Sequence, residues 1–87
     1  MPHISPTATS ILTLLNNIND LIVESNDREN ARDVMKATKI YAASKNFPLP
    51  EEKVEDFYAV LIDSRPFTLS ALIHDIATDI IVADQKK

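Results

Sequence analysis

The chain contains no glycine in its 87 residues. Glycine takes a positive φ more readily than any other residue, so left-handed turns in this chain must be made by Asn or Asp. Hairpin-rich folds become improbable, because the tight turns between strands depend on glycine. Glycine-rich phosphate loops, dinucleotide fingerprints, nucleophile elbows and EF-hand loops are excluded for the same reason. Cysteine is also absent, which excludes disulfides and thiolate metal sites.

Apolar residues recur at helical spacing through most of the chain, in four segments joined by short connections. Short connections favour antiparallel neighbours. We therefore predict an all-α fold, a compact antiparallel four-helix bundle, as a single domain over residues 1–87 with a flexible start at 1–5. Phe47 and Leu49, in a proline-containing connector, are expected to close one end of the bundle. The helices are predicted at about 6–24, 27–45, 50–63 and 66–84.

Residues that favour helix ends support these boundaries. Asn26, followed three residues later by Glu29, resembles a capping box at the start of the second helix. Asn46 can take the left-handed position at the end of that helix, where glycine would otherwise stand. At the start of the fourth helix, either Ser64 or Thr68 is predicted to be the cap.

The most apolar segment, 66–84, is apolar on more than one side. Its predicted core stripe consists of Leu69, Leu72, Ile73, Ile76, Ile80 and Ala83. Small and apolar residues also follow its back and one flank, namely Ala71, Thr78, Val82, Ala77 and Ile81. A helix of this kind usually touches protein on two sides, although scattered exposed Ala and Val side chains are also ordinary. We predict a protein-binding face at Ala71, Thr78, Ile81 and Val82, and the small core favours a homodimer.

The chain is acidic, with a net charge of −4 and a pI near 4.9. Four carboxylates gather within six residues at the start of the third predicted helix: Glu51, Glu52, Glu55 and Asp56. They are suited to a basic protein partner, or they only compensate the helix dipole. Nucleic-acid binding is unlikely for an acidic chain, because that affinity comes from Lys and Arg displacing counterions.

A basic face on the second helix offers an alternative function. Arg32, Lys36 and Lys39 share one side of that helix and are suited to phosphate contacts in a nucleic-acid-associated regulator. Acidic residues lie beside them and no aromatic residues alternate with them. A solvated face is therefore the better interpretation of this row.

One cluster resembles a reactive site. His74 and Thr78 stand one helical turn apart, as do Asp75 and Asp79. Two carboxylates and a histidine are suited to metal binding or acid–base chemistry. Charged residues on the solvent side of an apolar helix are the more ordinary interpretation, so a metal-binding or enzymatic protein centred on His74 is an alternative rather than the prediction.

The sequence shows no run of about 20 apolar residues and no positively charged leader, so we predict no membrane span and a cytoplasmic location. Its size, acidity and architecture resemble those of bacteriocin immunity proteins and other small bacterial or phage inhibitors, a resemblance that implies no particular site residues. The predicted function is a non-enzymatic protein–protein interaction module, such as a small acidic inhibitor, immunity or adaptor protein. Its predicted partner is another protein or a second copy of the chain, with no cofactor or metal.

Overall fold

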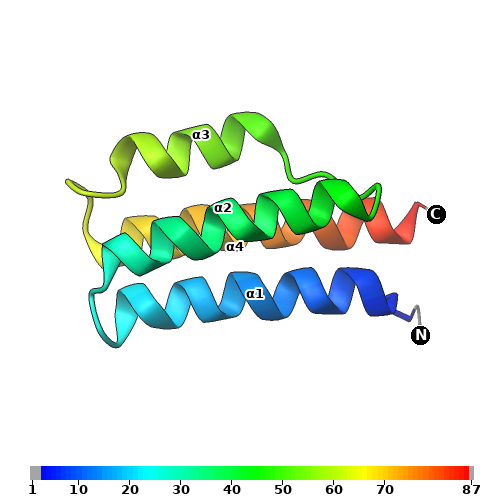
Figure 1. Cartoon of the computed structure of the whole chain (residues 1–87), viewed down its shortest axis with the longest axis horizontal. Coiled ribbons are helices and arrows are strands. Elements are labelled where there is room, and N and C mark those ends of the chain that lie inside the picture. Colours follow the sequence, from blue (N-terminus) through cyan, green and yellow to red (C-terminus); the bar gives the residue numbers. More distant parts are fainter. Residues whose placement is uncertain (1–2, 87) are drawn as a thin grey trace.

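The computed structural model describes residues 3–86, which form four α-helices and no strand (Figure 1). The helices are α1 (Pro6–Val23), α2 (Arg28–Ser44), α3 (Glu51–Val60) and α4 (Pro66–Gln85). The all-α, four-helix prediction is therefore confirmed. Met1 and Pro2, in the predicted flexible start, lie outside the described residues. Ser5 already belongs to the fold, because its hydroxyl caps α1 by accepting the Ala8 N–H at 3.2 Å.

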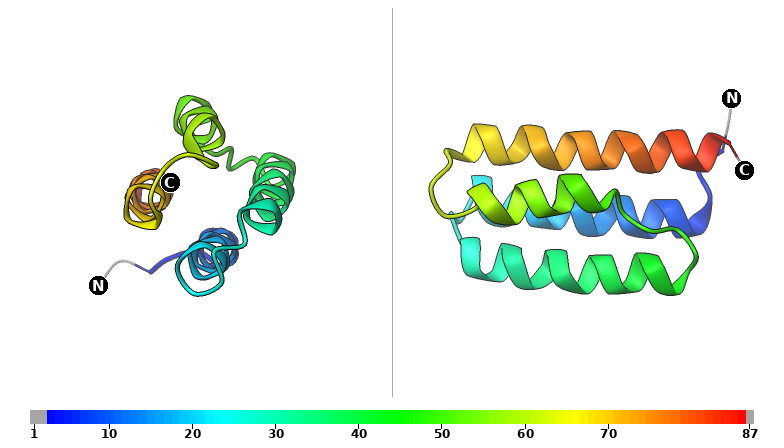
Figure 2. Two further views of the ribbon diagram at one scale, coloured as in Figure 1. Left: turned by 90° about the vertical axis from the view of Figure 1, so that its left-hand side faces the viewer. Right: turned by 90° about the horizontal axis from the view of Figure 1, so that it is seen from above.

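The four helices surround one core, and each runs opposite to its neighbours (Figure 2). α1 packs against α2 and α4, and α3 packs against α4. In the end-on view α2 and α4 occupy opposite corners. The two ends of the described chain meet at the same end of the bundle, where the Ser5 N–H donates a 2.9 Å hydrogen bond to the Asp84 carboxylate.

The core is built from the predicted apolar stripes of all four helices. Its largest fully buried side chains include Ile11, Leu15, Ile18, Ile22, Met35, Phe57, Leu61, Leu69, Ile76 and Ile80. Phe47 and Leu49 are buried too, as the connector pattern predicts. Ala83 was predicted in the core stripe but is exposed, because the ten-residue α3 does not extend alongside the last turn of α4 (Figure 1).

Asparagine makes both left-handed turns among the described residues. Asn26 has a φ of 50° and Asn46 a φ of 58°, which confirms the inference from the missing glycine. The predicted capping box at Asn26 is wrong: the N-cap of α2 is Asp27, whose carboxylate accepts the Asn30 N–H at 3.2 Å. Asn26 instead ends α1, where its N–H donates to the Ile22 carbonyl at 3.1 Å. A residue held in a left-handed turn cannot adopt the extended backbone that an N-cap requires.

The connection between α3 and α4 also differs from the prediction. α3 ends at Val60 rather than near residue 63, and the N-cap of α4 is Arg65, without a side-chain hydrogen bond. Neither Ser64 nor Thr68 caps α4. Pro66 occupies the first helical position, where its fixed φ suits the helix and its missing N–H needs no partner.

Candidate interaction surface

The outward side of α4 carries a stripe without formally charged side chains. Five residues, spaced alternately four and three apart along that side, form this outer stripe together with the neighbouring Val82. The outer stripe consists of Phe67, Ala71, His74, Thr78, Ile81 and Val82. All six are exposed, and Phe67 is 82% exposed. Val82 is 46% and Ile81 37% exposed. Phe67 lies at one end of the stripe and the pair Ile81 and Val82 at the other, with Ala71, His74 and Thr78 between them. Exposed apolar side chains that gather on one side of a protein mark interaction sites more often than scattered ones do.

The outer stripe exists because α4 is apolar on two sides. Leu69, Ile73, Ile76 and Ile80 fill the core, and nothing in the described chain covers the other side. α4 also has the length and composition of a membrane-crossing helix, with a mean hydropathy of 1.3, whereas the sequence analysis predicted no span. This finding rests on length and composition only, and 22% of that apolar window is buried inside the bundle, where Leu69, Ile73, Ile76 and Ile80 belong to the core.

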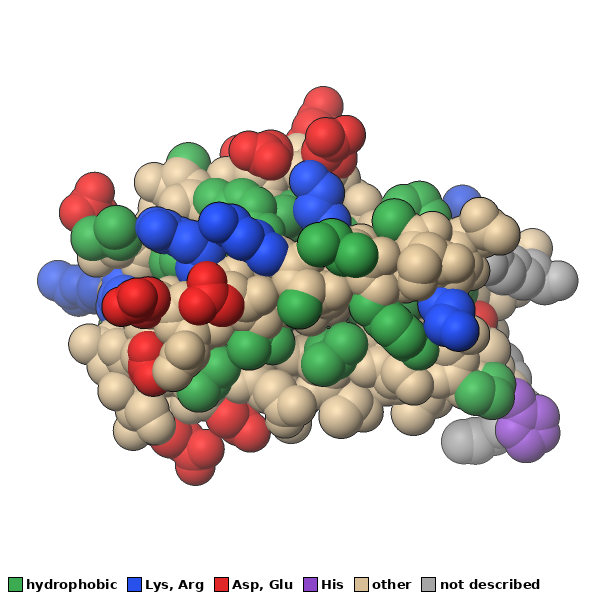
Figure 3. All heavy atoms as spheres, in the orientation of Figure 1, with side chains coloured by type: hydrophobic (Ala, Val, Ile, Leu, Met, Phe, Trp, Pro, Cys, Tyr) green, Lys and Arg blue, Asp and Glu red, His purple; other side chains and the backbone are tan. Residues whose placement is uncertain are grey.

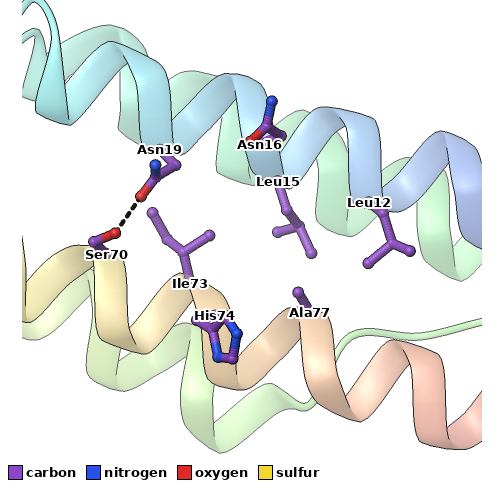
Figure 4. Close-up of a pocket in the computed structure, with 8 residues that line it drawn as sticks. All are labelled: Leu12, Leu15, Asn16, Asn19, Ser70, Ile73, His74 and Ala77. Atoms are coloured by element: carbon purple, nitrogen blue, oxygen red, sulfur yellow. Dashed lines mark hydrogen bonds between the residues drawn. The ribbon is translucent and has the colours of Figure 1, made fainter.

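A groove between α1 and α4 adjoins the outer stripe (Figure 4). The α1–α4 groove holds about 300 Å³ and is lined by Leu12, Leu15, Asn16, Asn19, Ser70, Ile73, His74 and Ala77. It opens where α4 presents the small side chains of Ser70 and Ala77 toward α1. The Ser70 hydroxyl donates to the Asn19 side-chain oxygen at 2.5 Å, which closes one end of the groove. Apolar walls with a few polar groups are typical of binding sites.

Charged side chains gather on other parts of the surface. Seen from the α2 side, Figure 3 shows blue and red side chains over α2 and α3. Neither residues 1–19 nor residues 66–74 contain Asp, Glu, Lys or Arg. The side of the bundle formed by α1 and α4 is therefore poor in charge, and Asp75 is the carboxylate that borders the outer stripe.

All four residues of the predicted acidic cluster of α3 are exposed: Glu51, Glu52, Glu55 and Asp56. Part of its negative charge is paired within the bundle, because the Lys39 ammonium lies 4.0 Å from the Glu55 carboxylate. On the next face of α3, Lys53 reaches across to Asp79 of α4 at 2.7 Å. The hydrogen bond that the Lys53 ammonium donates to the Asp79 carboxylate holds the pKa of Lys53 above its ordinary value. Lysines near α3 therefore weaken the cluster as a site for a basic partner.

The basic row of α2 is likewise divided. Lys36 is exposed, Arg32 is half-buried, and Lys39 faces Glu55. Three cations that differ in exposure and pairing do not form the uniform positive surface that phosphate contacts require.

The structure does not bring the predicted His74 cluster together. His74 lies beside the α1–α4 groove, whereas Asp79 turns toward α3 and pairs with Lys53. The Thr78 hydroxyl donates to the carbonyl of His74 at 3.0 Å, a bond within the helix. Over residues 3–86 no three His, Asp or Glu side chains are close enough to hold one metal ion.

Sequence reasoning missed two residues that depend on long-range packing. Arg28, at the start of α2, donates hydrogen bonds to the carbonyls of Leu61, Ile62 and Ser64 at the end of α3. Tyr58 buries its hydroxyl oxygen, for which the described residues provide no hydrogen-bond partner. Neither has a local signal, because both depend on how α2 and α3 are placed in space.

Comparison of the chain with protein-family models, curated proteins and solved structures found no match in any of the three. The class of protein is therefore defined by the fold alone, an all-α four-helix bundle. Its function must be inferred from the outer stripe, the α1–α4 groove and the distribution of charge around them.

Proposed function

We propose that this protein is a non-enzymatic interaction module that binds another protein through the outer stripe of α4 and the adjoining α1–α4 groove. The observation that carries the proposal is the exposed outer stripe itself, in which Phe67 is 82% open to solvent on a helix without formal charge over its first nine residues. Aromatic and aliphatic side chains that surround a groove are the usual anchors of a protein interface.

The rigidity of the site supports a binding role. α4 is a 20-residue helix with four side chains locked in the core, so the outer stripe is presented in one conformation. A partner therefore orders few additional groups when it binds, and little of the binding free energy is lost to conformational entropy. A small inhibitor, immunity factor or adaptor acts in this way, by covering a surface of its target with a preformed face.

The acidic cluster of α3 would act at the edge of such an interface rather than at its centre. Exposed carboxylates steer a basic partner during encounter but contribute little once solvated pairs form. Apolar contacts at the outer stripe would supply most of the affinity, with the α3 carboxylates influencing the rate of association and its dependence on salt.

Paired substitutions test the proposal. Ala71→Glu with Val82→Glu places two carboxylates in the outer stripe. The matched control, Ala37→Glu with Ile40→Glu, makes the same kind of change at exposed positions of α2. Circular dichroism and thermal unfolding check that both variants retain the fold.

The readout is affinity purification of each tagged protein from its source cells, followed by mass spectrometry. We expect the wild type and the α2 control to co-purify with the same protein, in similar amount, and the α4 variant to lose it. Equal recovery by all three proteins would refute the proposed site.

A further inference from the structure

We propose that a second copy of this chain covers the outer stripe, with the two α4 helices packed antiparallel around a two-fold axis close to His74. This inference rests on the proposed function, and it names the partner. It is carried by the spacing of the outer stripe, the distribution of charge and the area that the α1 and α4 side offers.

The outer stripe can pack against the outer stripe of a second copy that runs in the opposite direction. Its spacing of four, three, four and three residues is the repeat that keeps one side of a helix facing another helix. In a two-fold interface, residue i of the first copy meets residue j of the second, and residue j of the first copy meets residue i of the second. Reversal about His74 places Phe67 opposite the second copy's Ile81 and Ala71 opposite its Thr78. Large side chains then meet at both ends, Ala71 meets Thr78 on either side of the axis, and the two His74 side chains face each other at the axis.

Helix dipoles favour the antiparallel arrangement. A parallel pair would place two positive helix ends together and two negative ends together, whereas an antiparallel pair places opposite ends together. Parallel pairing would also put two Phe67 rings at one end of the contact and two Ile81 side chains at the other, which gives a less even surface.

Charge favours a second copy at this side over any other. Two molecules of net charge −4 repel each other, and the repulsion is strongest where carboxylates face carboxylates. The acidic α3 cannot meet another α3 without opposing its four carboxylates. The outer stripe and the α1–α4 groove contain no formally charged residue, and Asp75 lies beside them. They therefore offer self-association the least electrostatic opposition.

The available area sets the strength of the pair. A helix of 20 residues is about 30 Å long, and two neighbouring helices present a face about 18 Å wide, so each copy offers about 550 Å². The total of about 1,100 Å² lies just below the standard range for stable complexes, which begins near 1,200 Å². The dimer is accordingly weak and depends on protein concentration.

A lipid surface is the competing occupant of an exposed apolar helix side. Helices that lie on membranes carry Lys and Arg on their polar side, where they attract anionic lipids. Residues 66–85 contain no Lys or Arg, and their charged residues are Asp75, Asp79 and Asp84. These carboxylates repel an anionic membrane, so the composition of α4 favours protein over lipid.

Single-cysteine crosslinking tests the geometry, because the chain has no cysteine of its own. Facing Cα atoms of helices 8–10 Å apart lie about 4–5 Å from each other, within reach of a disulfide. The variants are Ala71→Cys, Thr78→Cys and His74→Cys, with Ala37→Cys on α2 as the matched exposed control. Each is oxidised at 200 µM protein, alone and in 1:1 mixtures, and analysed by non-reducing electrophoresis.

The proposed dimer predicts a distinct crosslinking pattern. His74→Cys pairs with itself, and the mixture of Ala71→Cys with Thr78→Cys gives at least fivefold more mixed dimer than either variant gives of its own dimer. Ala37→Cys remains at the background set by random collision. Self-pairing of Ala71→Cys and Thr78→Cys in excess of the mixed product would overturn the antiparallel arrangement.

Sedimentation equilibrium of the wild type supplies the second measurement, from 10 µM to 1 mM protein in 20 and 500 mM NaCl. Because the two copies carry charge of the same sign, salt strengthens the dimer, and Asp75→Asn strengthens it in 20 mM NaCl. A monomer at 1 mM in both salts would overturn the second-copy proposal.

That failure is distinguishable from failure of the proposed function. A monomeric wild type whose other protein partner is lost on Ala71→Glu and Val82→Glu overturns the dimer and leaves the interaction site standing. Co-sedimentation with vesicles of phosphatidylcholine and phosphatidylglycerol, abolished by the same substitutions, overturns both in favour of a lipid surface.

Discussion

Replacing Arg28 by Met tests the contact on which the end of α3 most depends. The Arg28 guanidinium donates to the Leu61 carbonyl at 2.6 Å and to the Ile62 carbonyl at 3.2 Å, and it also bonds the Ser64 carbonyl. Its Nε donates to the Asn26 side-chain oxygen at 2.9 Å, which fixes the orientation of the guanidinium. One side chain therefore bonds three carbonyls of the turn that begins at the C-cap of α3.

The expected loss of stability follows from these bonds. A hydrogen bond to a charged donor contributes about 1.5–3 kcal/mol, and bonds that share one donor group do not add fully. We expect Arg28→Met to lower the free energy of unfolding by about 2–4 kcal/mol, out of a total of about 4–13 kcal/mol for a chain of this length. Met retains most of the aliphatic stem, so the loss measures the guanidinium bonds rather than lost packing.

Urea unfolding followed by circular dichroism measures the effect. With a slope of about 1–2 kcal/mol per molar urea, the midpoint should fall by about 1–4 M. Arg32→Met, one helical turn further along α2, removes the same charge and is the matched control, with a shift expected below about 0.5 kcal/mol. Arg28→Lys should recover only part of the loss, because an ammonium cannot reproduce the planar fork. Equal midpoints for the Arg28 and Arg32 variants would refute the reasoning.

Three further substitutions test other parts of the fold by urea unfolding. Tyr58→Phe removes a buried hydroxyl without a partner among residues 3–86 and should raise the free energy of unfolding by about 1 kcal/mol. Burial, and then the charge of Glu55, raise the pKa of Tyr58 above 10.0. The stability that depends on a neutral Tyr58 phenol is therefore fully present below pH 10 and is lost as pH rises through the raised pKa. The variant should therefore lose less stability than the wild type between pH 9 and pH 12, and equal losses would contradict this. Asn46→Ala places a side chain that avoids positive φ at a φ of 58° and should lower the free energy of unfolding by about 1 kcal/mol, whereas Asn46→Gly should not; equal effects would show that the turn imposes no strain. Ser70→Ala removes the hydrogen bond to Asn19 and should lower the free energy of unfolding by about 1 kcal/mol. No change would mean that this bond does not hold α1 to α4.

The fold follows from patterns among residues that lie close together in the sequence. Apolar spacing locates each helix, and Ile11, Leu15, Ile18 and Ile22 of the first helix are buried at that spacing, with Leu14 and Leu21 half-buried beside them. The missing glycine leads directly to asparagine at the left-handed turns, and both Asn26 and Asn46 adopt them. These features are set by residues close in sequence, which is why sequence reasoning reaches them.

The departures have two causes, which are a choice between neighbouring residues and contacts that are distant in sequence. Asn26 and Asp27 are both good helix caps, and the choice falls to Asp27 because the left-handed turn occupies Asn26. The end of α3 is held by a hydrogen bond from Arg28, which is 33 residues away from Leu61 in sequence. Tyr58 has the spacing of a core residue, and only packing shows that its hydroxyl lacks a partner.

The predicted binding residues of α4 are all exposed, yet exposure in a single chain does not establish that they bind. Ala71, Thr78, Ile81 and Val82 could be placed on one side of a helix from their spacing alone. Phe67 and the α1–α4 groove could not, because the groove depends on the side chains that α1 and α4 bring together. The site thus extends beyond the predicted residues toward α1.

Amide chemical shifts measured on dilution test most directly whether the outer stripe is covered by a second copy. Two-dimensional ¹⁵N–¹H spectra of the wild type, recorded from 1 mM to 20 µM in 500 mM NaCl, need no substitution. The account predicts that the largest concentration-dependent shifts fall on Ala71, His74 and Thr78, with smaller shifts on α1 beside the groove and none at Ala37. Spectra that do not change with concentration, or changes confined to α2 and α3, would contradict it.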